Sequence, residues 1–332
     1  MAKRRMPRAR GSRRFEKPPL SSSALVDLLR SRGLAITDEA QAAPQISNIG
    51  YYRLSAYMVP FQRGRDNHGF KPGATFEDVM SLYSFDRQLR LLVLDALEHI
   101  EVRLRAAVTD EMSLKHQNAF WYTEPSYFRD WARHSEFLDQ VSERSRRQLE
   151  GRPEDPGDVH NYRSALEHYL VTYGEPEFPP SWIMMEGLTF GQVKSLYDNL
   201  QQREDSNRIA RQLGVPGPVL TSWLRTFLRF RNIGAHHGRL WNVVLGVAPT
   251  APKSKSVPWP RSHGKITDPR HGPIRIYPGL AAIQSLLLTT ASGLTWSQRL
   301  YELISDYPTV PQQAMGFPAD WHHERFWNLT SE

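Results

Sequence analysis

Apolar residues recur every three or four positions along most of the chain, a spacing typical of amphipathic α-helices. The strongest stripe lies within residues 75–112 and consists of Leu89, Val93, Ala96, Leu97, Ile100, Leu104 and Val108. Further helical stretches are predicted at 21–34, 37–59, 135–152, 161–174, 176–200, 215–245 and 279–307. No segment alternates convincingly between apolar and polar residues. The pattern therefore predicts an all-α fold.

Proline and glycine indicate where the predicted helices end. Residues 249–278 contain seven prolines, six Lys or Arg and one Asp, without a helical period, and are predicted to form a long basic loop. The chain is accordingly divided into a flexible basic tail (1–17), an N-terminal helical region (18–80) and a larger helical domain (81–330) that includes this loop.

The net charge of +7 is concentrated at the N-terminus, because residues 1–17 hold eight Lys or Arg and one Glu. Such an arm attracts polyanions, which makes nucleic acid the leading partner, although a solubilising tail explains the charge as well. The basic residues predicted to bind RNA lie in the tail and the loop. They are Lys3, Arg4, Arg5, Arg8, Arg10, Arg13, Arg14, Lys253, Lys255, Arg261, Lys265 and Arg270.

Several classes of protein are disfavoured by composition. The chain has no cysteine, which excludes disulfides, thiolate catalysis and cysteine-based zinc sites and fits a reducing cytoplasm. No apolar run is long enough for a transmembrane helix, and no apolar stretch follows the N-terminal arginines as it does in a secretory signal.

The segment RFRNIGAHHGRLWN, residues 229–242, carries the most distinctive chemistry. Arg231 offers a planar cation suited to phosphate, and His236 offers an imidazole that can transfer a proton. Asn232 adds an amide that can orient a hydroxyl or a phosphate oxygen. RNA cleavage requires a similar set, namely a base for the 2′-OH, a cation for the developing charge and a proton donor.

Helix geometry restricts how these groups can meet. On a continuous helix Asn232, His236 and Arg239 share one face, whereas Arg231 points about 140° away from His236. Either Gly234 loosens the turn, or the site is composite and uses two copies of the helix in a dimer. The simpler interpretation is structural: the charged groups pair with carboxylates or cap the helix, and Leu240 and Trp241 belong to the core.

The sequence gives little support for a metal site or a cofactor site. Adjacent histidines on a helix diverge by about 100° and cannot both face one ion, and the chain has no HExxH pattern. No nucleophile-elbow pattern supports a serine triad. We therefore predict no metal and no cofactor.

Five blocks in order along the chain resemble the Abi family of bacterial abortive-infection proteins, the AbiD/AbiF-like group. They are NIGYYRLSAYMVPF (48–61), LYSFDRQLRLLVLDALEHIEVRLR (82–105), PPSWIMMEGLTFGQVKSLYDNL (179–200), RNIGAHHGRLWN (231–242) and MGFPADWHHERFW (315–327). The basic tail and the loop at 249–278 have no counterpart in the family pattern.

This resemblance implies a HEPN-like helical bundle with an N-terminal extension. HEPN domains often carry an R-x4–6-H motif and act as metal-independent endoribonucleases, usually as homodimers. By position in the motif, Arg231, Asn232 and His236 are the catalytic candidates, and His237, Arg239 and Asn242 have supporting roles. The resemblance also implies RNA as a partner, as substrate or as a small noncoding RNA.

Other residues admit two interpretations. Glu101 and Arg105 are spaced for an ion pair within one helix, but Glu101 can also orient Arg231 from a neighbouring helix. Glu98 is interpreted as a surface residue. Four aromatic residues near the N-terminus could stack on RNA bases but are better explained as core; they are Tyr51, Tyr52, Tyr57 and Phe61.

The sequence thus predicts an anti-phage protein that cleaves RNA without a metal. Two other functions stay open: an RNA-binding module without catalysis, and a protein-interaction switch in which the helix with the motif forms a dimer or phage-sensing interface.

Overall fold

The computed structural model describes Gly11 and residues 14–64, 68–150, 164–246, 248–262, 273–289 and 292–327. Within these ranges it contains α-helices, short 3-10 helices and three isolated β-bridges, but no strand. The all-α prediction is therefore confirmed. The chain divides into two compact units, residues 1–84 and 85–332. The predicted boundary after residue 80 remains a prediction.

The first unit begins with three short helices, α1 (Ser22–Ser31), α2 (Glu39–Ile49) and α3 (Tyr51–Met58). The Ser21 hydroxyl accepts a hydrogen bond from the backbone N–H of Ala24, as expected of a helix N-cap. The single helix predicted over 37–59 is wrong, because Gly50 adopts a positive φ of 90° and separates α2 from α3. Tyr57 is buried as predicted for a core residue, whereas Tyr52 is 91% exposed.

The long helix α4 (Phe76–His116) starts in the first unit and supplies the core of the second. All seven members of its predicted apolar stripe are buried. The helices that follow are α5 (Trp131–Leu149), α6 (Ala165–Thr172), α7 (Ser181–Glu186), α8 (Phe190–Asp198), α9 (Arg203–Gln212), α10 (Gly217–Ala235), α11 (Tyr277–Leu287) and α12 (Ser292–Asp306).

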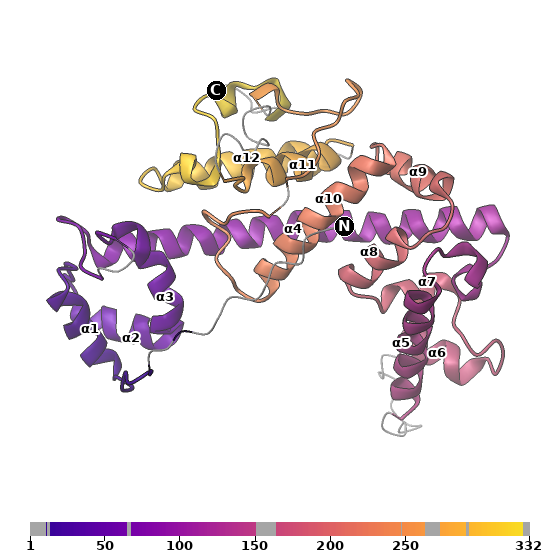
Figure 1. The fold of residues 1–332 in the computed structure, drawn as a ribbon, viewed down its shortest axis with the longest axis horizontal. Helices are drawn as coiled ribbons and strands as arrows, with labels where there is room; N and C mark the ends of the chain where they lie inside the picture. Colours follow the sequence, from indigo (N-terminus) through magenta and orange to yellow (C-terminus); the bar gives the residue numbers. More distant parts are fainter. Residues whose placement is uncertain are drawn as a thin grey trace. The chain divides into compact units, whose positions relative to one another are not determined.

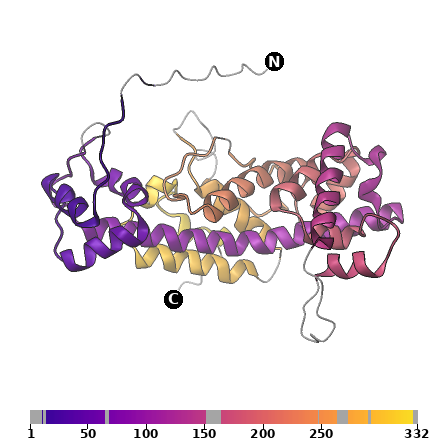
Figure 2. The same cartoon turned by 90° about the horizontal axis from the view of Figure 1, so that it is seen from below.

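Within the second unit α10, α11 and α12 lie along α4 (Figure 1 and Figure 2). Figure 1 shows α10 and the α11–α12 pair beside it, and in Figure 2 α12 lies below α4 and α10 above it. The indole N–H of Trp296 on α12 donates to the Leu92 carbonyl of α4 at 2.9 Å. Arg103 reaches from α4 to the Thr289 hydroxyl beyond α11 at 2.8 Å. Apolar burial and these polar ties together fix the helices on α4.

Two further stretches contain more helices than the sequence indicated. Residues 279–307 form two helices, α11 and α12. In residues 176–200 the helical spacing predicted from Val193 onward coincides with α8, and the short helix α7 precedes it. The α9 helix was not predicted, because its sequence REDSNRIARQ is almost entirely polar. It is nevertheless held to α4 through an ion pair between Arg208 and Glu111.

The C-terminal block packs within the second unit through Trp321 and Trp327, both buried. Its Glu324 carboxylate accepts hydrogen bonds from the backbone N–H groups of Arg261 and Ser262. This contact ties the described part of the predicted basic loop to the 3-10 helices near the end of the chain.

None of the helices in the described ranges combines the length and the apolar character that a membrane crossing requires.

Candidate functional site

The helix that carries the predicted catalytic residues is built to pack closely on α4. Its inner face buries Trp223, Phe227 and Phe230 completely. At Gly234 the two helices approach so closely that a Cβ there would lie 2.9 Å from the Leu94 side chain of α4. Gly234 therefore lies inside a regular helix, where the missing side chain allows the close contact with Leu94. It does not loosen the turn between Arg231 and His236.

The α10 helix ends at Ala235 with a Schellman-type turn. The N–H of His237 donates to the Gly234 carbonyl at 3.0 Å, and the N–H of Gly238 donates to the Ile233 carbonyl at 2.7 Å. His237 takes the left-handed position of this turn, with φ of 55°. The helix predicted to continue to residue 245 is therefore wrong, and Arg239 does not share a helical face with Asn232 and His236.

The turn leaves both histidines exposed, and Asn232 is exposed one turn earlier. His236 is the C-cap residue, and its own N–H donates to the Asn232 carbonyl at 3.0 Å. The imidazole of His236 therefore lies at the end of a helix, on the surface, where it is accessible to a large substrate.

Arg231 lies in a cavity of about 400 Å³ between α4, α7 and α10, which we call the Arg231 cavity. Apolar and charged side chains line it: Leu94, Leu97, Glu98, Glu101, Val102, Arg105, Glu186 and Arg231. Within the described part of the chain, no hydrogen bond or ion pair engages the Arg231 guanidinium. Its donors are available to an anionic ligand.

Glu101 is on the wall of the same cavity, where its carboxylate pairs with Arg105. The side chains of this pair are 17% and 14% exposed. Arg105 also donates to the Leu188 carbonyl at 2.7 Å and to the Met185 carbonyl, so it holds the turn between α7 and α8. Glu101 thus has a strong partner other than Arg231, and its orienting role remains a prediction. Glu98 is largely exposed on the same wall.

The chain beyond the histidines is fixed by a residue that the sequence interpretation missed. Asp86 on α4 is fully buried, and its Oδ1 accepts the backbone N–H of Leu240 at 3.0 Å and that of Trp241. Its other oxygen pairs with Arg90, which is also buried. Asp86 and Arg90 are part of the block at 82–105, but charged residues are common on this amphipathic helix, and nothing in the sequence indicated that Asp86 contacts Leu240 and Trp241.

Arg239 and Asn242 flank buried Trp241. The Arg239 guanidinium lies 5.9 Å from the centre of the Trp241 ring, within range of a cation–π interaction. The Asn242 carbonyl accepts a hydrogen bond from Arg275 at 2.7 Å. Burial lowers the pKa of Arg275, and the positive charge of Arg239 lowers it further. Arg275 was counted in the basic loop but was not predicted as a site residue.

The structure describes four of the residues predicted to bind RNA, and all four are exposed. They are Arg14, Lys253, Lys255 and Arg261. The others lie outside the described residues: Lys3, Arg4, Arg5, Arg8, Arg10, Arg13, Lys265 and Arg270. No cluster of three or more potential metal ligands occurs among the described residues, and the predictions of no metal and no cofactor stay predictions.

The chain matches a model of a known protein family. A family model described as "Abi-like protein" matches residues 45–242, more than half of the chain. The match contains the blocks at 48–61, 82–105, 179–200 and 231–242 and ends at Asn242; the block at 315–327 lies beyond it. No curated protein and no solved structure matches the chain. Since abortive infection is the process for which this family is named, the match indicates a role in phage defence, and the chain belongs to the Abi-like protein family.

Proposed function

We propose that this protein is an anti-phage endoribonuclease of the HEPN type that cleaves RNA without a metal ion. The observation that carries the proposal is the arrangement at the end of α10. An arginine with open donors lies in a cavity, and an exposed histidine follows it at the helix terminus. These are the groups that phosphodiester cleavage through the 2′-OH needs.

In this mechanism His236 takes the proton of the 2′-OH or gives a proton to the leaving 5′-oxygen. Arg231 stabilises the negative charge that develops on the phosphate oxygens, since its planar guanidinium can donate two parallel hydrogen bonds. Asn232, exposed one turn before His236, orients the scissile phosphate. The products carry a 2′,3′-cyclic phosphate or a 3′-phosphate.

The site is proposed to be composite, with His236 of one copy and Arg231 of another acting on one phosphate. A regular helix holds Arg231 about 140° from His236, and α10 stays helical through Ala235. The tight contact between Gly234 and Leu94 supports this version, because it disfavours an unwound turn. A homodimer with two facing α10 helix ends would bring the two groups together.

RNA is proposed as the partner of the exposed basic residues, either as substrate or as a small noncoding RNA. Lys253, Lys255 and Arg261 are exposed cations that can neutralise backbone phosphates.

The first experiment compares cleavage of labelled RNA by the wild type, Arg231→Ala and His236→Ala, with and without EDTA. Arg225→Ala is the matched control, because Arg225 is exposed on the same helix. We expect the wild type and Arg225→Ala to cleave RNA in the presence of EDTA. Arg231→Ala and His236→Ala should not cleave it. Mixing the two inactive variants tests the composite site, because a mixed dimer restores one intact pair. Cleavage that needs Mg²⁺ contradicts the mechanism, and RNA binding without cleavage by the wild type favours a binding module.

A further inference from the structure

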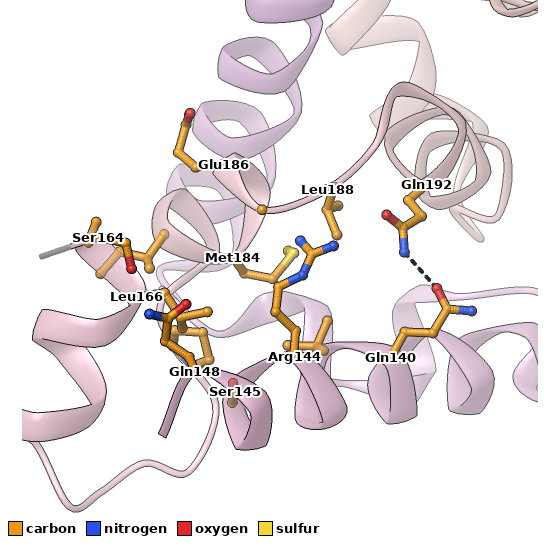
Figure 3. A pocket seen from close by; sticks show the side chains of 15 residues that line it. Gln140, Arg144, Ser145, Gln148, Ser164, Leu166, Met184, Glu186, Leu188 and Gln192 are labelled. Carbon is orange, nitrogen blue, oxygen red and sulfur yellow. Dashed lines mark hydrogen bonds between the residues drawn. The ribbon is translucent and has the colours of Figure 1, made fainter. Parts of the chain in front are cut away.

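A second cavity lies between α5, α6 and α7 and the start of α8, with a volume of about 490 Å³ (Figure 3). We call it the Arg144 cavity. Its apolar lining comes from Val141, Leu166, Ile183, Met184 and Leu188, and its polar lining includes Gln140, Arg144, Ser145, Gln148 and Gln192. A cavity of this size with a mainly apolar wall and a few polar groups is typical of a small-molecule site.

Arg144 is the cation of this cavity. In Figure 3 its guanidinium points between Met184 and Leu188. It lies against Gly187 so closely that a Cβ on that glycine would be 2.3 Å from Nη1. No hydrogen bond or ion pair joins Arg144 to any described residue. A half-buried guanidinium without a carboxylate is a natural partner for an anion.

The neighbouring arginines of α5 behave differently. Arg146 and Arg147 both donate to Glu143, at 2.9 Å and 2.7 Å, and both are exposed. Arg144 faces the cavity instead. Glu186 is the other charged residue of the lining, and in Figure 3 its carboxylate points away from Arg144.

The polar groups around Arg144 can recognise the edge of a planar ligand. Gln192 donates to Gln140 at 2.7 Å at one end of the cavity, and Gln148 donates to Glu167 at 3.2 Å at the other. The Ser145 hydroxyl is buried without a hydrogen-bond partner. Glutamine amides offer a donor and an acceptor side by side, the pattern that pairs with a nucleobase edge.

We infer that the Arg144 cavity binds a nucleotide. The phosphate meets the Arg144 guanidinium, and the base lies on the apolar wall formed by Met184 and Leu188, with its edge toward the glutamine amides. The nucleotide is either a free ribonucleoside monophosphate or part of an RNA strand. This inference goes beyond the proposed function and does not depend on RNA cleavage, because it concerns binding at a separate cavity.

The test is calorimetric titration of the full-length protein with the four ribonucleoside 5′-monophosphates, their nucleosides and a short 5′-phosphorylated RNA. Arg144→Gln removes the charge, and Leu166→Trp fills the cavity. Arg147→Gln is the control. It removes an arginine from the same helix, but the Arg147 side chain is 73% exposed and does not line the cavity. Thermal unfolding checks that each variant is folded.

We expect a monophosphate to bind, and the matching nucleoside to bind about tenfold or more weakly, because a charge-assisted hydrogen bond is lost. Arg144→Gln and Leu166→Trp should weaken binding, and Arg147→Gln should leave it unchanged. Binding of RNA alone with the same dependence on both variants identifies a nucleotide within a strand as the ligand. If neither a monophosphate nor the RNA binds, the inference is wrong. It is also wrong if Arg144→Gln and Leu166→Trp bind these ligands as tightly as the wild type does.

Discussion

Replacing Asp86 by alanine is expected to destabilise the second unit strongly. The carboxylate is fully buried, pairs with Arg90 and accepts the backbone N–H groups of Leu240 and Trp241. Breaking a buried ion pair by removing one partner costs about 3–5 kcal/mol. Each buried N–H that loses its acceptor adds about 1–3 kcal/mol. Because the three contacts share one side chain, they are not additive, and we expect a loss of about 4–6 kcal/mol in the free energy of unfolding.

Urea unfolding followed by tryptophan fluorescence measures this loss, since Trp241 is itself buried beside Asp86. Asp86→Asn keeps an acceptor oxygen without the charge and should lose less. The matched control is Asp95→Ala on the same helix. Asp95 pairs with Arg299 at 2.7 Å, but the two side chains are 43% and 53% exposed, so removal should cost about 1 kcal/mol or less. Equal losses for Asp86→Ala and Asp95→Ala would refute the reasoning.

Three further variants test other features by urea unfolding. His237→Gly should stabilise the protein by about 0.5–1 kcal/mol, since glycine adopts the left-handed position without strain; a loss contradicts this. Gly234→Ala should lower the free energy of unfolding by about 1–3 kcal/mol, because the added methyl group collides with Leu94. Helix propensity alone predicts the opposite, an increase in the free energy of unfolding. Burial raises the pKa of Tyr197 and Tyr277 to about 12 from 10.0, so the stability these hydroxyls contribute is present below pH 10 and is lost as the pH rises toward 12. Tyr277→Phe should reduce that loss, and an unchanged pH profile contradicts the assignment.

The fold was readable from the sequence wherever apolar periodicity was strong. The α4 stripe extends over several turns, and every member is buried. At α9 and at Gly50 the same method failed. The polar α9 helix depends on partners such as Glu111, which lies far away in sequence. Gly50 breaks a stretch whose apolar spacing continues across it, because spacing alone does not report a positive φ.

For the candidate site, the sequence located the residues but not their environment. Arg231 and His236 were selected by spacing and family resemblance, but the end of α10 depends on His237 adopting a conformation that favours glycine. Asp86 and its contact with Leu240 join residues 154 positions apart. Such a contact can be identified only from the three-dimensional structure, in which α4 and the segment after α10 lie side by side.

The turn between α7 and α8 borders both cavities. Arg105 fixes its carbonyls at Met185 and Leu188 from the Arg231 side, Arg144 covers Gly187 from the other, and Glu186 lines both. A ligand that moves this turn from one cavity therefore changes the affinity of the other, and thermodynamic linkage makes the effect reciprocal. Only if the nucleotide proposed for the Arg144 cavity displaces this turn would its binding alter the surroundings of Arg231, so the turn between α7 and α8 is the element through which the two cavities could be coupled.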